Sequence, residues 1–352
     1  MSTHHESIFE DDLPNGHGAG DVVDGTGRGL FRSLMKLARP KQWTKSAFVL
    51  FGPVYGLQAC QEEGRDLVVV GVGAFLAAAA FALVSSGSYV LNDIGDAEAD
   101  RNHPRKRNRP IASGDVEIGT ARAFALLLFG AAALLTAFIP EPGGTNGVSM
   151  RLLVAATLAI YVLNVIAYSA FLKHRVIADV MSLSSGFVLR VMAGCAAVAI
   201  VPSTWLLNVT LFLAMFLAFG KRLGERRTAA ETGQLERMLK HRRVQERYTD
   251  ELLRMAVVVT GVATLLTYAF YIQQQEQYIL GFNLLWLTLL PATYGLLRAI
   301  VLVEHGKYDD PTELAIHDRP FQVACLAFVL MTLGLLYWQF TGAIIPPVSL
   351  DP

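Results

Sequence analysis

The sequence predicts an all-α polytopic membrane protein, and two observations support this. Hydrophobic residues make up 53% of the 352 positions, and the mean hydropathy of +0.40 is too high for an ordinary soluble domain. These residues are concentrated in runs of roughly 17 to 25, the length that an α-helix needs to cross a bilayer. We therefore expect a bundle of membrane-spanning helices.

Nine such runs follow one another along the chain. The first is short and is interrupted by Pro53 and Gly56, which weakens it as a continuous helix. The nine expected spans lie at about 46–60, 68–91, 121–139, 152–171, 177–200, 204–220, 255–273, 279–303 and 321–340.

The distribution of basic residues supports this count and sets the orientation. With the N-terminus in the cytoplasm, the loops near 92–120, 172–176, 221–254 and 304–319 lie on the same side. Of the 30 Lys and Arg residues, only Arg65 and Arg151 then fall in loops on the other side. This asymmetry is what the positive-inside rule predicts.

The remaining segments divide the chain simply. Residues 1–30 are rich in Gly, Asp, His and Glu and are expected to form a disordered cytoplasmic tail. Residues 31–345 form the nine-span domain, and residues 346–352 form a short outer tail. The three cysteines have no metal-ligand spacing, and the sequence has no P-loop, dinucleotide-binding or nucleic-acid-binding motif. We expect no nucleic-acid partner.

An acidic motif follows the second run, where the chain leaves the membrane. If it is helical, Asp93, Asp96 and Asp100 share one face, because they are spaced i, i+3, i+7. Three convergent carboxylates repel one another unless a cation lies between them. Mg²⁺ is held by one or two protein carboxylates and by substrate phosphate. The motif therefore predicts a magnesium-bound phosphorylated substrate; the alternative is a solvated helix end.

Basic and polar residues gather on the same side of the membrane. Lys106 and Arg109 belong to the basic run after the acidic motif, and Tyr168 and Lys173 mark the next inner boundary. Four residues apart, Lys41 and Lys45 are expected to share a helix face beside Trp43. This pair is either a site for lipid phosphate or an ordinary interfacial anchor.

Three further sets of residues are candidates for the site. Arg190 lies about a dozen residues into its span, where a guanidinium needs a polar cavity or a carboxylate; it contacts substrate or forms a structural ion pair. Lys221, Arg222 and Glu225 emerge from the sixth span. Asp318 and Arg319 precede the last one and either face the cavity or form a local ion pair.

The acidic motif, the following segment 106–114 and the nine spans together resemble the UbiA superfamily of intramembrane prenyltransferases. The resemblance covers about residues 31–340 and implies a nine-helix intramembrane prenyltransferase-like bundle. Segments 39–45, 172–174, 184–190, 220–222 and 315–319 resemble the branch that transfers phosphoribosyl groups.

One departure from the usual superfamily pattern favours that branch. Most members carry a second Asp-rich motif after the sixth span, whereas this chain has Lys221, Arg222 and Glu225. A basic pair does not ligate Mg²⁺ but can hold a phosphate, such as the 5-phosphate of phosphoribosyl diphosphate, PRPP.

The resemblance implies Mg²⁺-dependent transfer of 5-phosphoribosyl from PRPP to a polyprenyl (decaprenyl-type) phosphate, with release of pyrophosphate. This reaction would supply the precursor of a lipid-linked arabinose donor at a bacterial cytoplasmic (inner) membrane. The enzyme is expected to act as a monomer or as a homo-oligomer. Asp93, Asp96 and Asp100 are the implied metal-binding catalytic residues. The implied substrate-binding residues are Asn92, Lys106, Arg109, Lys41, Lys45, Tyr168, Lys173, Arg190, Lys221, Arg222, Glu225, Asp318 and Arg319.

Two other functions remain open at this stage. Transfer of an isoprenyl group to an aromatic or quinone-precursor acceptor would use the same first acidic motif, but would be expected to need the second. A membrane transporter would explain Arg190 and Asp179 inside predicted spans, but it would not require three acids on an inner loop.

Overall fold

Helices make up nearly all of the structure. This computed structural model describes residues 27–102, 106–141, 149–231, 247–274, 278–279, 282–305 and 317–340. Eight helical segments in these ranges are long and apolar enough to cross a membrane, which confirms the all-α polytopic fold. They are α4 (Leu67–Gly95), α7 (Ile118–Ala137), α8 (Met150–Ala170), α9 (Ala178–Ala197), α10 (Thr204–Glu231), α13 (Asp250–Gln274), η4 (Leu284–Thr288) continued by α14 (Leu289–Glu304), and α16 (Arg319–Phe340).

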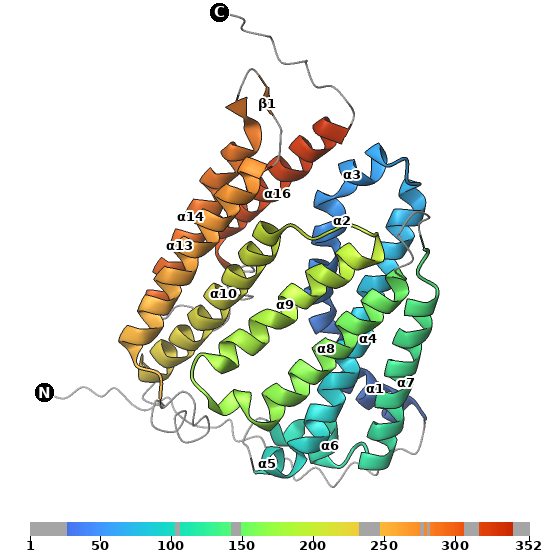
Figure 1. Ribbon diagram of the computed structural model, residues 1–352. Coiled ribbons are helices and arrows are strands. Elements are labelled where there is room, and N and C mark those ends of the chain that lie inside the picture. The colour runs from blue at the N-terminus through green and yellow to red at the C-terminus, as the bar shows by residue number, and fades with distance from the viewer. Residues whose placement is uncertain are drawn as a thin grey trace, which may run out of the picture.

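The first expected span, 46–60, differs in form from the other eight. Its place is taken by three short helices in series: η1 (Pro40–Leu50), α2 (Phe51–Tyr55) and α3 (Leu57–Glu62). Figure 1 shows them running from one end of the bundle to the other. Gly56 separates α2 from α3, and Pro53 has no N–H to donate. Gly194 permits the close approach of η1 to α9, because a Cβ at Gly194 would collide with the carbonyl oxygen of Val49 in η1.

Short elements cap the two ends of the bundle. One end carries α1 (Gly27–Ala38), α5 (Ala97–Arg101), η2 (Lys106–Asn108), α6 (Pro110–Ser113) and η3 (Leu172–His174) (Figure 1). We call this the α5–α6 end. At the opposite end, β1 (Tyr278–Ile279) pairs antiparallel with β2 (Phe282–Asn283), with Tyr278 opposite Asn283.

The α4 helix organises the half of the bundle that carries the acidic motif. It packs against α7, α8, α9 and η1, while α10 packs against α9 and α13 in the other half. Ala77 and Ala80 of α4 are fully buried, and small side chains of this kind let membrane helices approach closely. Large apolar side chains such as Phe75 and Leu126 are exposed, as expected for surfaces that face lipid.

The expected tails lie mostly outside the described residues. Residues 1–26 and 341–352 are among the positions of which nothing structural is stated, and so is most of the basic loop that follows α10. The predicted disorder of residues 1–30 therefore stays a prediction, although its last residues belong to α1.

Candidate active site

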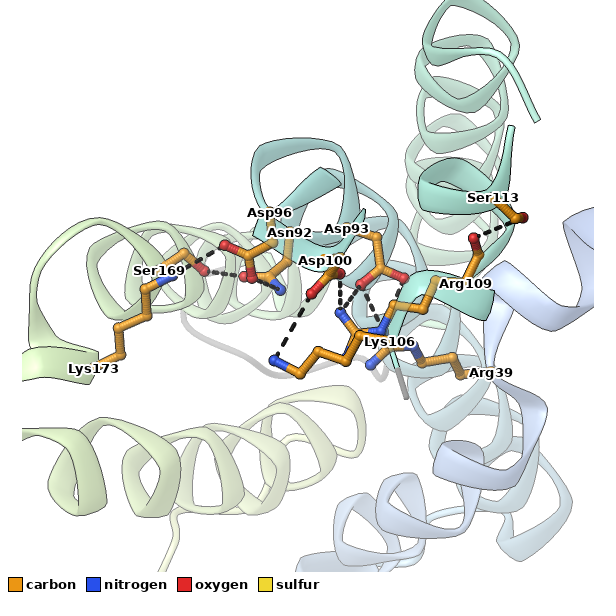
Figure 2. Close-up of polar contacts among 10 residues, drawn as sticks. All are labelled: Arg39, Asn92, Asp93, Asp96, Asp100, Lys106, Arg109, Ser113, Ser169 and Lys173. Carbon is orange, nitrogen blue, oxygen red and sulfur yellow. Dashed lines mark hydrogen bonds and ion pairs between the residues drawn. The ribbon is translucent and has the colours of Figure 1, made fainter. Parts of the chain in front are cut away.

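Asp93 lies at the α5–α6 end of α4 and is held by two arginines (Figure 2). Only 3% of it is exposed. Arg39 Nη2 lies 2.6 Å from Asp93 Oδ1 and 2.8 Å from Oδ2, and Arg109 Nη1 lies 3.1 Å from Oδ1. An aspartate so enclosed is stable as an anion only because of these cations.

Backbone strain at Arg39 accompanies its contact with Asp93. This residue joins α1 to η1 with φ 51° and ψ 59°, the left-handed region that a residue with a Cβ rarely adopts. The preceding carbonyl, of Ala38, accepts a hydrogen bond from Ser86 Oγ, which in turn accepts one from Trp43 Nε1. The guanidinium also lies over the ring of Tyr89, 5.0 Å from its centroid. These contacts fix the turn and direct Arg39 to α4.

Arg109 joins Asp93 to a second carboxylate. Its Nη1 is also 2.7 Å from Asp100 Oδ2, while Lys106 Nζ lies 3.8 Å from Asp100 Oδ1. The local sequence places Arg109 there, because Pro110 starts α6 and Gly114, with φ 89°, ends it. One guanidinium nitrogen therefore bridges two nearly buried aspartates.

Asp96 points to a different set of partners (Figure 2). Lys173 Nζ lies 3.1 Å from its Oδ1, and Asn92 Nδ2 donates to its Oδ2 at 3.0 Å. Ser169 Oγ donates to Asn92 Oδ1 at 2.6 Å. The three aspartates therefore differ in their partners, because Arg109 joins Asp93 to Asp100 whereas Asp96 contacts Lys173. A one-residue break at Asp96 separates α4, which ends at Gly95, from α5. That the three share one helical face stays a prediction.

The donor chemistry fits Mg²⁺ at two of the three aspartates. Within the described ranges, no three Asp, Glu, His or Cys side chains are grouped so as to hold a metal ion. Asp93 and Asp100 nevertheless place hard oxygen donors on either side of one cationic nitrogen, that of Arg109. Because Mg²⁺ needs only one or two carboxylates beside substrate phosphate and water, this pair is sufficient.

The cluster carries an excess of positive charge. Three carboxylates are in contact with four cationic side chains: Arg39, Lys106, Arg109 and Lys173. A surplus cation at a nearly buried acidic site favours a polyanionic ligand, because phosphate oxygens accept the same hydrogen bonds that the carboxylates now accept.

Arg190 is buried well inside the bundle, and the ion pair expected as its structural alternative is absent from the described residues. Its guanidinium donates to the Gly186 carbonyl at 2.8 Å and to Ser85 Oγ and Tyr161 OH, both at 3.2 Å. It also lies 4.8 to 5.3 Å from the ring centroids of Phe81, Tyr161 and Phe187. Arg190 therefore ties α9 to α4 and α8 by hydrogen bonds and cation–π contacts.

Arg222 forms an ion pair with Asp179, which is completely buried at the start of α9. Tyr248 OH donates to Asp179 Oδ1 at 2.7 Å and accepts from the Ile177 N–H at 2.7 Å. Burial, followed by the hydrogen bond to Asp179, raises the pKa of Tyr248 to about 12. The tyrosine is therefore a neutral donor at physiological pH, and the network links α9 and α10 to the segment that precedes α13.

The neighbours of Arg222 complete the α10 part of the predicted site. Lys221 and Glu225 are half-buried on the same helix, and Tyr168 of α8 lies close enough to Arg222 to interact electrostatically. Of the predicted pair, Arg222 is thus committed to Asp179, and Lys221 is the more accessible cation.

Lys41 and Lys45 are both exposed on η1. The prediction that they share a helix face is wrong, because η1 is a 3₁₀ helix. With three residues per turn, positions four apart are rotated by about 120° from each other.

Asp318 and Arg319 have separate surroundings. Arg298 binds both carboxylate oxygens of Asp318, at 3.2 and 2.9 Å, and the Phe321 N–H donates to Asp318 Oδ1 at 2.9 Å. The ion-pair alternative therefore describes Asp318, which also caps α16. Arg319 lines a cavity of about 610 Å³ between α14 and α16 that is otherwise formed by apolar residues and Tyr294.

An apolar groove of about 670 Å³ opens between α2, α3, α4 and α16. Its walls include Tyr55, Val70, Phe75, Leu333 and Tyr337. The groove offers hydrocarbon-like surface but no charged side chain.

Three contact residues were missed as site candidates from the sequence. Arg39 and Ser169 touch the acidic motif directly, and Tyr248 supports Asp179. The position of Arg39 directly before a proline marked a turn, but it did not indicate the partner.

Comparisons with known proteins agree with this fold. Residues 49–325 match the UbiA prenyltransferase family. The chain is 31% identical over 311 residues to a decaprenyl-phosphate phosphoribosyltransferase of Mycobacterium tuberculosis, which covers 88% of this chain and 96% of that protein. The protein of the same name in Corynebacterium glutamicum is 32% identical, covering 88% of each chain.

Among solved structures, a UbiA homolog from Archaeoglobus fulgidus bound to GPP and Mg²⁺ has the same fold. It superposes with a TM-score of 0.57 at 15% identity, over 87% of this chain and 99% of that one. The fold and site thus define a multi-pass membrane transferase. This chain belongs to the UbiA prenyltransferase family.

Proposed function

We propose that this enzyme transfers the 5-phosphoribosyl group of PRPP to a polyprenyl phosphate of the decaprenyl type, releasing pyrophosphate. The relatives named decaprenyl-phosphate phosphoribosyltransferase, aligned over nearly the whole chain, support this proposal. The lipid product would serve as a precursor of a lipid-linked arabinose donor. We place the α5–α6 end in the cytoplasm of a bacterial inner membrane, where PRPP is available.

The observation that carries the proposal is the pairing of an acidic and a basic phosphate site. Four cations surround the three aspartates, and α10 offers Lys221 and Arg222 at the position where an allylic-diphosphate enzyme would have a second acidic motif. PRPP carries phosphate at both ends, a diphosphate and a 5-phosphate. One site of each kind matches this charge distribution.

For the donor, Asp93 and Asp100 would hold Mg²⁺, with Asp96 and Asn92 completing the hydrogen-bonded wall. The ion neutralises charge on the departing pyrophosphate when it is bound. Arg109 and Lys106 are positioned to move from carboxylate to diphosphate oxygens, and Lys173 does the same beside Asp96. We assign Lys221 to the 5-phosphate, with Arg222, which is paired with Asp179, and Glu225 beside it on α10.

For the acceptor, the protein needs no strong general base. A polyprenyl phosphate is already ionised near neutral pH, so its oxygen attacks the anomeric carbon as the bond from that carbon to pyrophosphate breaks. Lys41 and Lys45, exposed where η1 enters the bundle, are our assignment for the acceptor phosphate. The groove between α2, α4 and α16 provides apolar surface for the isoprenoid.

The depth of Arg190 assigns it a different role from Lys41 and Lys45. Its partner Ser85 precedes Asp93 by eight residues on α4, which corresponds to about 12 Å along a helix. We propose that Arg190 maintains the walls of the site, and that any contact with substrate involves the part of the lipid that reaches this depth.

The test is to give the purified protein PRPP and Mg²⁺, with and without polyprenyl phosphate, and separately an isoprenyl diphosphate with an aromatic acceptor. Pyrophosphate should be released from PRPP only when polyprenyl phosphate is present. Ribose 1-diphosphate, which lacks the 5-phosphate, should react poorly because Lys221 is left without its partner. Prenylation of an aromatic acceptor without turnover of PRPP would replace this proposal with isoprenyl transfer.

A further inference from the structure

The α1 helix has an apolar arc that is only partly covered by the bundle. Leu37 is completely buried, Ala38 is 2% exposed, and Leu34 packs against the core around Val90 and Ile111. These three residues fasten the C-terminal half of α1 to α4 and α6. The bundle therefore covers only one side of this apolar arc and leaves the other side exposed.

The uncovered part of this arc consists of large apolar side chains. Phe31 is 66% exposed and Met35 is 36% exposed. They are four residues apart and therefore lie on the same face of the helix. Leu30, in the first turn, is 45% exposed. A soluble environment would leave this surface in water, which the hydrophobic effect opposes.

Cationic residues flank the exposed apolar side chains. Arg32 and Lys36 are exposed and, four residues apart, form a second face beside Met35. Lys36 Nζ donates to the carbonyl of Asn108 at 2.9 Å, whereas Arg32 is exposed and has no hydrogen bond or ion pair within the part of the chain that the structure describes. Apolar and cationic faces side by side are the pattern of helices that lie in a membrane interface.

The position of α1 identifies the surface that it meets. It lies at the α5–α6 end, and through Arg39 it continues directly into η1, the first element that enters the bundle (Figure 1). Trp43, near this entry, is 39% exposed, as expected for a ring at headgroup level.

We propose that α1 lies in the surface of the membrane at this end and binds anionic phospholipid. Phe31 and Met35 insert among the acyl chains, and Arg32 contacts headgroup phosphates. The helix is thereby held on two sides, by lipid on its exposed face and by the bundle on its buried face. Lys36 donates a hydrogen bond to Asn108, the neighbour of Arg109, and Ala38 directly precedes Arg39. The lipid-bound helix therefore supports both arginines that hold Asp93.

Site-directed spin labelling of the full chain in lipid nanodiscs tests this placement. The three native cysteines are replaced by alanine, and single labels are introduced by Phe31→Cys, Arg32→Cys and, as a lipid-facing reference on α4, Phe75→Cys, whose native side chain is 69% exposed. Accessibility to oxygen reports the acyl region, and accessibility to a water-soluble nickel chelate reports the aqueous phase.

The label at position 31, like the reference label at position 75, should be more accessible to oxygen than to the nickel chelate. The label at position 32 should be more accessible to the nickel chelate. Equal nickel access at positions 31 and 32 would place the face in water. Exclusion of both reagents from position 31 would mean that another segment or a second copy of the chain covers it. Either result would overturn the proposal.

Lipid charge is tested with the same label at position 31. Replacing part of the phosphatidylcholine with phosphatidylglycerol should raise the ratio of oxygen to nickel accessibility there, and Arg32→Gln should remove this increase. Arg122→Gln, an exposed arginine at the inner end of α7, is the matched control and should retain it. An unchanged ratio on adding phosphatidylglycerol would refute anionic-lipid binding by Arg32.

Discussion

The guanidinium of Arg39 binds both carboxylate oxygens of Asp93, at 2.6 and 2.8 Å, although the two residues are 54 positions apart. The contact joins the turn between α1 and η1 to the α5–α6 end of α4. Because the carboxylate is almost fully buried, its orientation depends on this one nitrogen, Nη2, which donates to both oxygens.

Arg39→Lys should therefore impair the enzyme without unfolding it. A lysine keeps the positive charge, but its compact ammonium replaces the planar guanidinium that both contacts Asp93 and lies over the ring of Tyr89. We expect kcat/KM for PRPP to fall about 10- to 100-fold, the equivalent of one lost charge-assisted hydrogen bond. Arg122→Lys is the control, and equal activities of the two variants would show that the guanidinium of Arg39 is dispensable.

Asp93→Asn and Asp96→Asn should each abolish transfer while the protein still inserts and folds. At Asp93 the amide has the volume of the carboxylate but binds Mg²⁺ weakly, whereas at Asp96 it loses the ion pair with Lys173. We expect pyrophosphate release to fall at least about 100-fold, with monodisperse protein in detergent as evidence of folding. Full activity of Asp93→Asn would remove Asp93 from the metal assignment, and full activity of Asp96→Asn would show that its contact with Lys173 is dispensable.

Arg109→Ala should increase the affinity for divalent metal measured without substrate. In the structure its Nη1 lies between Asp93 and Asp100, so a metal ion must displace it. Removing this competing cation favours the metal, whereas removing a phosphate ligand weakens PRPP binding. Titration with Mg²⁺ or Mn²⁺ in a calorimeter should show tighter binding than in the unmodified protein; weaker binding would mean that Arg109 supports the metal site.

Lys221→Ala and Arg222→Ala should both raise the KM for PRPP more than that for the lipid, but only the second should destabilise the protein. Loss of Arg222 leaves the buried Asp179 without its cation, a change that typically costs about 3–5 kcal/mol. Thermal unfolding in detergent measures this difference. The double variant Asp179→Asn with Arg222→Ala should recover stability but not PRPP affinity. A selective effect of Lys221→Ala on the lipid would reverse the donor and acceptor assignments.

Hydropathy, charge placement and the acidic motif were sufficient to predict the membrane bundle, the clustering of basic residues at one end and the family. These features are local: a run of apolar residues needs a bilayer, and each backbone polar group there needs a helix. Eight of the nine expected spans follow this logic directly. The first does not, because it is divided into three short helices, and its close approach to α9 at Val49 depends on Gly194 of that distant helix.

The partners of the site residues were decided by the tertiary structure. Sequence spacing placed Asp93, Asp96 and Asp100 on one face, but it did not show that Asp96 contacts Lys173 while Arg109 lies between the other two. It likewise could not select Arg39 for Asp93 or Tyr248 for Asp179. Such pairs depend on where helices end and how they pack, and these are properties of contacts between distant segments that no local pattern of residues contains.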